Sequence, residues 1–317
     1  MRLILRILGI LLGIIVLALA AIFIYLFTAL PKKEPPQQIT VEATPARLAR
    51  GEYLSRNVTM CLHCHADRNL QFYSTPPIPG TEGQGGLFVK QEGLGEMYSP
   101  NITPHALANW TDGEIIRAIT AGVNKDGDPI FPIMPYKVYA HLKQDDLHSI
   151  IAYIRSLKPI AREIQRSKLD FPLNLIVRTI PGPPTVDTKV QSDPGHYLAI
   201  IAGCIDCHTP INDRGQPLPG MSLAGGQKFG NVRSANITPD RETGIGNWSE
   251  QEFLVAFKKW RNPAMQQIVM PEDRNTVMPW IDFSGMREED LSAIYGYLRT
   301  VPAVRNQIEK FPAPVPQ

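Results

Sequence analysis

All four cysteines of this 317-residue chain stand in two pentapeptides of one form. Residues 61–65 read CLHCH and residues 204–208 read CIDCH, so that two residues separate each pair of cysteines and a histidine follows directly. Thiols and imidazoles form covalent links and metal bonds. The repetition indicates that the same chemistry is done twice in one chain.

The spacing predicts covalent attachment of haem. In a Cys-x-x-Cys-His motif the two thiols add to the vinyl groups of a porphyrin, and the adjacent histidine binds the iron as its proximal ligand. We therefore expect two covalently attached haems c, one in each half of the chain. The predicted attachment and iron-binding residues are Cys61, Cys64, His65, Cys204, Cys207 and His208.

Three other uses of paired cysteines fit the sequence less well. A structural zinc site needs two Cys-x-x-Cys pairs that converge on one ion, whereas each pair here has its own half and its own histidine. A thioredoxin-like redox pair needs a strand–helix–strand setting, which is missing. Structural disulfides would explain an even number of cysteines in an exported protein, but they would not explain the histidine that follows each pair.

The two halves of the chain repeat one another well beyond the motifs. Further segments match in the same order, with offsets of 135 to 144 residues. A duplicated unit of about 110–125 residues explains this order. The matching pairs are 51–54 and 195–198, 99–104 and 234–239, 109–119 and 247–257, 133–139 and 277–283, and 145–157 and 289–301.

Each unit is predicted to contain three short helices separated by loops. The first leads into the cysteine motif. The second begins with a capping box, in which Thr111 or Ser249 is followed three residues later by glutamate. The third carries apolar side chains at helical spacing over residues 147–154 and 291–298, which is typical of a buried stripe. Strand-like alternation is scarce, so we expect an all-α fold.

The N-terminal segment is apolar throughout. Residues 7–30 carry no charge, and as a helix they would extend roughly 36 Å, enough to cross a hydrocarbon core of about 30 Å. A cleavable signal peptide is the alternative, but the apolar run continues ten residues beyond the Ala-Leu-Ala at 18–20 that resembles a cleavage site. We therefore expect an uncleaved transmembrane anchor. Basic residues flank the segment on both sides, so charge alone does not fix its orientation.

With these motifs the chain resembles membrane-anchored diheme c-type cytochromes that carry two class I cytochrome c domains in tandem. Over residues 46–317 it is similar to the cytochrome c subunits that accompany periplasmic alcohol, gluconate and related dehydrogenases. It differs from the alcohol dehydrogenase subunits in having two haem motifs rather than three. Haem attachment of this type implies a single-pass protein of the bacterial inner membrane, with its haem domains in the periplasm.

The resemblance and the proline-rich segments together predict five parts. The apolar content of 44% is sufficient for two separate cores, and the net charge of +2 gives no indication of nucleic-acid binding. The predicted parts are a transmembrane anchor (1–31), a stalk (32–45), a first cytochrome c domain (46–166), a linker (167–190) and a second cytochrome c domain (191–317).

A methionine sulfur is the predicted sixth ligand of each iron. Met134 and Met278 each precede a proline, follow the motif histidine by 69 and 70 residues, and occupy the same place in the repeat. In class I cytochromes, which the chain resembles, the methionine ligand comes from such a loop. A thioether raises the reduction potential relative to a second histidine. The methionines without such counterparts, which are expected to pack in the core, are Met97, Met221, Met265, Met270 and Met286.

Other polar and aromatic residues have simpler expected roles. The five histidines outside the ligand positions are expected on the solvated surface, with a bis-histidine iron or a proton relay as the alternative. The matched tryptophans Trp110 and Trp248 are expected to be buried beside the haem or at the helix start. Asn101 and Asn236 are expected to shape a turn, with a contact to a haem propionate as the alternative. The five histidines are His63, His105, His141, His148 and His196.

These features predict an electron-transfer protein rather than an enzyme. Two six-coordinate haems would pass single electrons between a periplasmic dehydrogenase or respiratory complex as donor and a quinone or terminal oxidase as acceptor. A diheme peroxidase is the alternative, but its two haems need to differ, whereas the two Met-Pro loops match. A thiosulfate-oxidising diheme enzyme can use a further cysteine as ligand, and here all four are taken. A structural anchor subunit would have much the same sequence.

Overall fold

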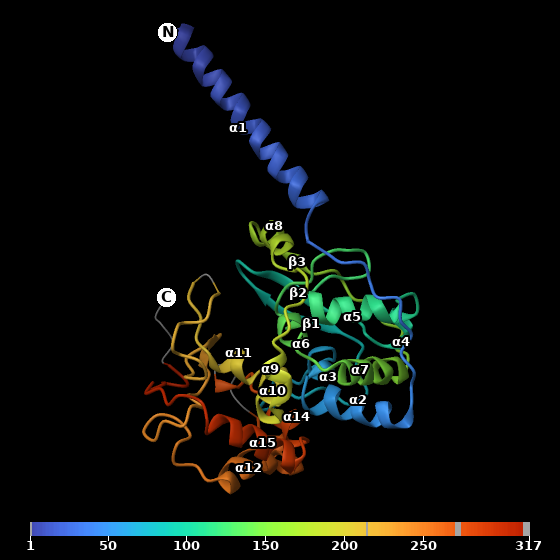
Figure 1. Ribbon diagram of the computed structural model, residues 1–317, viewed down its shortest axis with the longest axis vertical. Helices are drawn as coiled ribbons and strands as arrows, with labels where there is room; N and C mark the ends of the chain where they lie inside the picture. Colours follow the sequence, from blue (N-terminus) through green and yellow to red (C-terminus); the bar gives the residue numbers. More distant parts are fainter. Residues whose placement is uncertain (1, 214, 270–273, 313–317) are drawn as a thin grey trace.

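The computed structural model describes residues 2–213, 215–269 and 274–312. One long helix, α1 (Arg2–Thr28), projects away from a body that holds all the other elements (Figure 1). None of the residues of α1 is buried, and it is the one helix of the described residues that is long and apolar enough to cross a membrane.

The first repeat unit is built of short helices around a strand pair. Its elements are α2 (Pro45–Asn57), α3 (Cys61–Cys64), β1 (Gly86–Gln91), β2 (Gly95–Ser99), α4 (Pro104–Leu107), α5 (Asp112–Ala121), α6 (Tyr136–Tyr139) and α7 (Gln144–Ser156). The segment between the units contains β3 (Lys168–Leu169), α8 (Leu173–Ile176), the 3₁₀ turn η1 (Val177–Thr179) and α9 (Thr188–Ser192).

The second repeat unit repeats the order of the matched helices. Its elements are α10 (Pro194–Ile201), α11 (Cys204–His208), β4 (Lys228–Phe229), β5 (Val232–Arg233), α12 (Glu250–Lys258), η2 (Lys259–Arg261), α13 (Pro263–Gln266), α14 (Trp280–Ser284) and α15 (Glu288–Leu298). It lacks a counterpart of α4 and adds η2 and α13.

Both predicted capping boxes are confirmed. The Thr111 hydroxyl accepts a hydrogen bond from the backbone N–H of Glu114, and the Glu114 carboxylate accepts one from the backbone N–H of Thr111. Ser249 and Glu252 make the same pair of bonds at the start of α12. Each box satisfies two N–H groups that the first turn of a helix leaves free, so the sequence itself sets where these helices begin.

A matched glycine brings the first and last helices of each unit into backbone contact. A Cβ built on Gly51 of α2 would lie 1.9 Å from the carbonyl oxygen of Ser149 in α7. A Cβ on Gly195 of α10 would lie 2.1 Å from the carbonyl oxygen of Ala293 in α15. Any larger residue would push the two helices apart, which explains why glycine stands at both positions.

The predicted apolar stripes form one continuous core that includes residues of both units. In α7, Ile150 and Ile151 are 1% and 0% exposed, and in α15, Leu291 and Leu298 are 0% and 1% exposed. The stripe predicted for the third helix of each unit is therefore confirmed. Because the cluster crosses between the units, each unit buries part of its surface against the other.

The all-α prediction was incomplete, because the chain also forms two small antiparallel sheets. Strands β1, β2 and β3 form one sheet and β4 and β5 form another. The hairpin of β1 and β2 turns through Gly93 and Gly95, whose positive φ angles of 78° and 103° suit glycine. Strand β2 ends at Ser99 and leads directly to Pro100, which contacts the first cysteine motif.

The segment expected to be a stalk lies along the first unit. The backbone N–H of Val41 donates to the Asp112 carboxylate at 2.7 Å. A Cβ on Gly113 would lie 1.9 Å from the carbonyl oxygen of Gln37, so the segment runs against the start of α5. The chain that leaves α1 is thus held against the body.

Candidate functional site

The two cysteine motifs form short helices that begin in the same way. Helix α3 follows Met60, which has left-handed backbone angles of φ 55° and ψ 23°. Helix α11 follows Gly203, which occupies the equivalent position with φ 75° and ψ 13°. Non-glycine residues rarely adopt this conformation, so its presence in both units indicates that the turn before the motif is required.

Both motif histidines are oriented by a backbone carbonyl at the matching place in the repeat. His65 Nδ1 lies 2.8 Å from the carbonyl oxygen of Pro100, and His208 Nδ1 lies 2.7 Å from that of Ala235. A carbonyl can only accept a hydrogen bond, so Nδ1 carries the proton and Nε2 keeps its lone pair. Burial lowers the pKa of both imidazoles, which favours the neutral form. This is the arrangement of a metal-binding histidine whose other nitrogen is held in place.

The thiols of the motifs are unpaired and uncharged. All four cysteines lie in the described part of the chain and none forms a disulfide. Burial raises the pKa of the Cys64 and Cys204 thiols to about 12 and that of Cys207 to about 11. A reactive redox cysteine is a thiolate, so these thiols do not suit that role. The described residues also contain no group of three or more His, Cys, Asp or Glu side chains that could hold a metal ion.

The two Met-Pro loops have the same geometry. Pro135 and Pro279 have φ and ψ of −80° and 54° and of −82° and 63°, and each precedes a short helix. The carbonyls of Met134 and Met278 each accept a hydrogen bond of 2.8 Å from the backbone N–H two residues later. Both methionines are half-buried against the core. No contact within the described structure tests their binding to iron, so that role stays a prediction.

A buried hydroxyl beside the first Met-Pro loop fits a bound cofactor. Tyr136 stands two residues after Met134, is 2% exposed, and its hydroxyl has no hydrogen-bond partner among the described residues. Trp280 holds the equivalent position in the second unit. A buried unpaired donor is costly, and the polar edge of a haem would supply the missing acceptor. The donor set and this orphaned hydroxyl together fit covalent haem.

The asparagine turns are confirmed. The Asn101 carbonyl oxygen accepts from the backbone N–H and the hydroxyl of Thr103, at 2.8 and 2.7 Å, and Asn236 does the same with Thr238. The Asn101 amide donates to the carbonyls of Ile160 and Arg162. Both of its N–H groups are therefore used, and the alternative contact to a haem propionate is wrong for Asn101.

Two of the histidines expected on the surface are buried. His63 is 6% exposed and lies 2.8 Å from the Asp282 carboxylate of the second unit, so contact between units covers it. His148 is 7% exposed because α2, α4 and α5 all pack against α7. The expectation holds for His105, which is exposed, while His141 and His196 are half-buried.

The remaining aromatic and methionine expectations have mixed outcomes. Trp110 is half-buried, but Trp248 is 40% exposed, so its expected burial was wrong; its backbone carbonyl, rather than its ring, is bonded to the Tyr295 hydroxyl. Met97 and Met286 are 3% and 1% exposed, which confirms packing. Met221 and Met265 are half-buried, and Met270 lies outside the described residues.

A pair of matched tyrosines joins the two units reciprocally, which the sequence alone did not reveal. Tyr53 of the first unit donates from its hydroxyl to Asp290 and accepts from the backbone N–H of Arg287 in the second. Tyr197 of the second unit donates to Asp146 at 2.6 Å and accepts from the backbone N–H of Lys143 in the first. Cations also cover both rings, with Arg287 over Tyr53 at 4.6 Å and Lys143 over Tyr197 at 4.7 Å.

The cysteine motifs meet near the centre of this interface. Met60 and Gly203, the equivalent residues before the motifs, lie close together: a Cβ built on Gly203 would lie 3.9 Å from Met60 Cε. Negative charge on Cys207 would raise the pKa of Cys64 in the other unit, so these thiols are within electrostatic reach. The tyrosine contacts are thus made twice with the partners exchanged, as they would be across an approximate twofold axis.

Other contacts of the interface have no counterpart, among them His63 with Asp282 and the contacts of Ser74. The loop around Ser74 in the first unit holds the Met278 loop of the second: the Ser74 hydroxyl donates to the Met278 carbonyl at 2.7 Å. The Ser74 N–H also donates to the Asn275 side chain, whose amide returns a bond to the Phe72 carbonyl. One unit therefore positions the predicted sulfur ligand of the other.

Each unit therefore has two neutral thiols, an imidazole with a free Nε2 and a loop that presents a thioether. This is the donor set of c-type cytochromes. Comparison with known proteins supports this class. The chain is 30% identical over 291 residues to the fructose dehydrogenase cytochrome subunit of Gluconobacter japonicus, and 30% identical over 288 residues to the cytochrome c subunit of the quinone alcohol dehydrogenase of Gluconobacter oxydans. These matches cover 86% and 83% of the chain.

The chain spans 56% of the length of each of those two relatives. A diheme cytochrome c-type protein of Cereibacter sphaeroides is 27% identical over 270 residues, which cover 77% of this chain and 82% of that protein. No protein-family model matches the chain. The resemblance to a diheme c-type cytochrome is confirmed, and cytochrome c relatives imply haem c as the cofactor.

Proposed function

We propose that the chain is a membrane-anchored electron-transfer protein that carries single electrons through two covalently bound haems c. The observation that carries the proposal is the matched pair of imidazoles, each held by a carbonyl so that Nε2 is free to bind iron. Bound haem supplies a one-electron redox centre. The anchor is α1, and the haem units face the periplasm.

The proposed role of each residue follows from its place in the repeat. Cys61 and Cys64, and likewise Cys204 and Cys207, form the thioether links that keep haem in a small unit. In each unit the motif histidine and the methionine, Met134 or Met278, would both bind the iron, so no open site for a substrate would remain. Two matching Met-Pro turns favour a carrier over a peroxidase, whose active haem has an exchangeable face.

The proposed donor is the catalytic subunit of a periplasmic dehydrogenase, or a respiratory complex. Two relatives are named as cytochrome subunits of fructose and alcohol dehydrogenases, and a third as the cytochrome c subunit of gluconate 2-dehydrogenase of Pantoea cypripedii, 27% identical over 286 residues. The chain spans about half the length of such relatives. The sugar or alcohol named for their dehydrogenases is therefore not assigned to the partner of this chain. The proposed partner is therefore a class of enzyme, without a named substrate.

Expression with a cytochrome c maturation system tests the proposal. We expect a mass increase of two haems, loss of free thiols and an absorption spectrum of reduced low-spin haem that carbon monoxide and peroxide leave unchanged. Binding of either molecule at one haem would instead indicate an enzyme. An unmodified, colourless polypeptide from the same system would overturn the haem assignment itself.

A further inference from the structure

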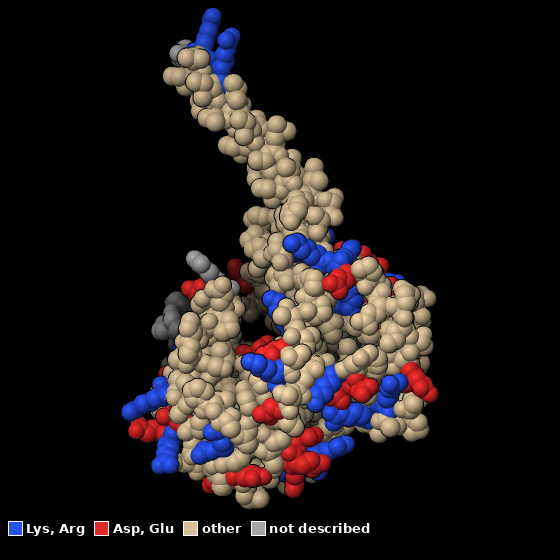
Figure 2. All heavy atoms as spheres, viewed as in Figure 1, with Lys and Arg blue, Asp and Glu red and all other residues tan. Residues whose placement is uncertain are grey.

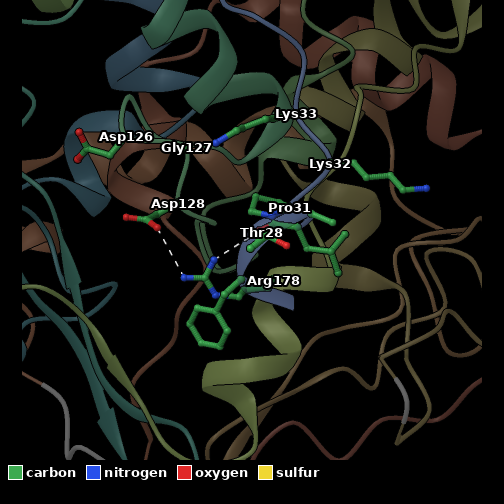
Figure 3. A pocket seen from close by; sticks show the side chains of 11 residues that line it. Thr28, Pro31, Lys32, Lys33, Asp126, Gly127, Asp128 and Arg178 are labelled. Carbon is green, nitrogen blue, oxygen red and sulfur yellow. Dashed lines mark hydrogen bonds and ion pairs between the residues drawn. The ribbon is translucent and has the colours of Figure 1, made fainter. Parts of the chain in front are cut away.

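The outer end of α1 is fastened to the segment between the two units. Arg178 of η1 lies with its guanidinium 4.2 Å from the centre of the Phe27 ring and donates to the Leu30 carbonyl at 3.4 Å. The same side chain forms an ion pair of 3.7 Å with Asp128 of the first unit (Figure 3). One arginine thus connects the helix end, η1 and the body.

This attachment fixes the depth of η1 and α8 if α1 crosses a membrane. The uncharged residues 7–30 extend roughly 36 Å against a hydrocarbon core of about 30 Å, so Leu30 lies close to the polar boundary. Tyr25 near the end of the helix suits that boundary. Helix α8 precedes η1 without a gap, and Figure 1 shows it beside the foot of α1, at the side of the body that faces the helix. It therefore lies at headgroup level.

The segment at this level is apolar and exposed. Residues 171–177 contain no charged side chain, and Phe171 and Ile176 are 79% and 45% exposed. Large apolar side chains are stabilised by removal from water, so water is a poor environment for both. Lysine and arginine side chains lie beside acidic ones where α1 meets the body (Figure 2). Lys32, Lys33 and Arg178 line the hollow at its foot together with Asp126 and Asp128, and Asp128 pairs with Arg178. Basic side chains of this kind are attracted to lipid phosphates.

We propose that α8 and Phe171 lie in the headgroup region of the outer leaflet and form a second attachment of the protein to the bilayer. The occupant of this apolar surface is lipid, because the surface continues from the membrane-crossing helix and is joined to it by Arg178. The proposal rests on the membrane anchoring proposed above. Two attachments, unlike one, fix the orientation of both haem units relative to the membrane.

Spin labels on the full haem-loaded chain in lipid nanodiscs test this arrangement. Phe171→Cys and Ile176→Cys carry the probes, since haem attachment consumes the native thiols. Val255 of α12 is 50% exposed, and Val255→Cys is the control for water. Leu17 of α1 is 73% exposed, and Leu17→Cys is the control for lipid. The collisional accessibility of each label to oxygen, which concentrates in lipid, is compared with that to a water-soluble nickel complex. The haem absorption spectrum checks that each variant folds.

We expect the ratio of oxygen accessibility to nickel accessibility to be severalfold higher for the labels at 171 and 176 than for the label at 255. Labels at 171 and 176 that behave like the label at 255, while position 17 is in lipid, would overturn the second attachment and leave the anchor intact. A label at position 17 that is accessible to nickel would overturn the anchor itself. If this surface binds a protein partner instead of lipid, the labels at 171 and 176 will behave like the label at 255, because no partner is present in the nanodisc.

Discussion

The two repeat units hold their histidines in the same way but differ in how deeply they enclose the motif. In the first unit Leu62 and His63 of α3 are 2% and 6% exposed, and His65 is 8% exposed. In the second unit the residues of α11 are only half-buried, or exposed in the case of Asp206. The difference arises because the second unit packs Asp282 against His63, while Asp206, at the position equivalent to His63, stays exposed. Duplicated sites with equal motifs can therefore differ in environment through the contacts between the copies.

Removing one pair of thiols at a time gives the largest expected effect. The variants Cys61→Ala with Cys64→Ala, and Cys204→Ala with Cys207→Ala, should each lose the mass of one haem. The first should also lower the melting temperature more, because its motif lies inside the shared core. Intact-mass spectrometry and circular dichroism measure both quantities. Equal losses of thermal stability would contradict the difference in enclosure.

The methionine variants test whether the two loops act alike. Met134→Ala and Met278→Ala should each open one iron to carbon monoxide and lower its reduction potential, by on the order of 0.1 V within the range of about 0.8 V that axial ligands span. Spectroelectrochemistry resolves the two haems. Met97→Leu is the control and should leave both potentials in place, since Met97 is core packing. Unchanged spectra in both alanine variants would remove the sulfur ligands from the assignment.

Each of the reciprocal tyrosines is expected to contribute to the free energy of unfolding, with a smaller effect than loss of a haem or of an iron ligand. Tyr53→Phe and Tyr197→Phe each remove a hydrogen bond to a carboxylate, which costs about 1.5–3 kcal/mol in the free energy of unfolding. The loss should be greater for Tyr197, which is 3% exposed and donates to an aspartate that is 7% exposed. Denaturant titration of the haem-loaded protein measures both. Tyr98→Phe, in the β1–β2 hairpin, is a matched control away from the interface and should have little effect.

A hydrogen bond present only in the first unit sharpens the comparison further. The Tyr139 hydroxyl donates to the carbonyl of Thr59, two residues before the first cysteine. The second unit has Phe283 and Ala202 in these places. Tyr139→Phe makes the first unit like the second and should cost about 0.5–1.5 kcal/mol, with a change in the spectrum of the first haem alone. A change at both haems would mean that the tyrosine acts through the shared interface.

The smallest effect concerns an acid-sensitive turn in the second unit. Asp240, where the first unit has His105, accepts hydrogen bonds from Thr243 and from the N–H of Glu242, and these bonds hold its pKa below the usual 3.8. A carboxylate with a lowered pKa stabilises the folded state above its unfolded pKa, and this contribution is lost as pH falls through the folded value. The Thr243 amide resonance should therefore shift below about pH 4. In the Asp240→Asn variant the Thr243 amide resonance should not shift over this pH range.

The sequence predicted the parts of the site that local patterns determine. The motifs, the capping boxes at Thr111 and Ser249 and the common turn of the Met-Pro loops depend on residues near one another in the chain. The β1–β2 hairpin was missed because its apolar residues do not alternate: Leu87, Phe88 and Val89 are consecutive, and the strand register shifts between Leu87 and Val89. The reciprocal contacts of Tyr53 and Tyr197 could not be derived, since a repeat shows which residues are equivalent but not which surfaces meet. The same limit explains the error at His63.

The twofold relation between the units has a consequence for the origin of the fold. Tyr53 and Tyr197 make the same bonds to opposite copies, so the contact is of the isologous kind that identical subunits make. A single-unit polypeptide with this tyrosine and the aspartate of its last helix would therefore pair with itself through both contacts at once. Fusion of two such genes would preserve a homodimer inside one chain, and each copy would then be free to diverge where its motif is enclosed or open.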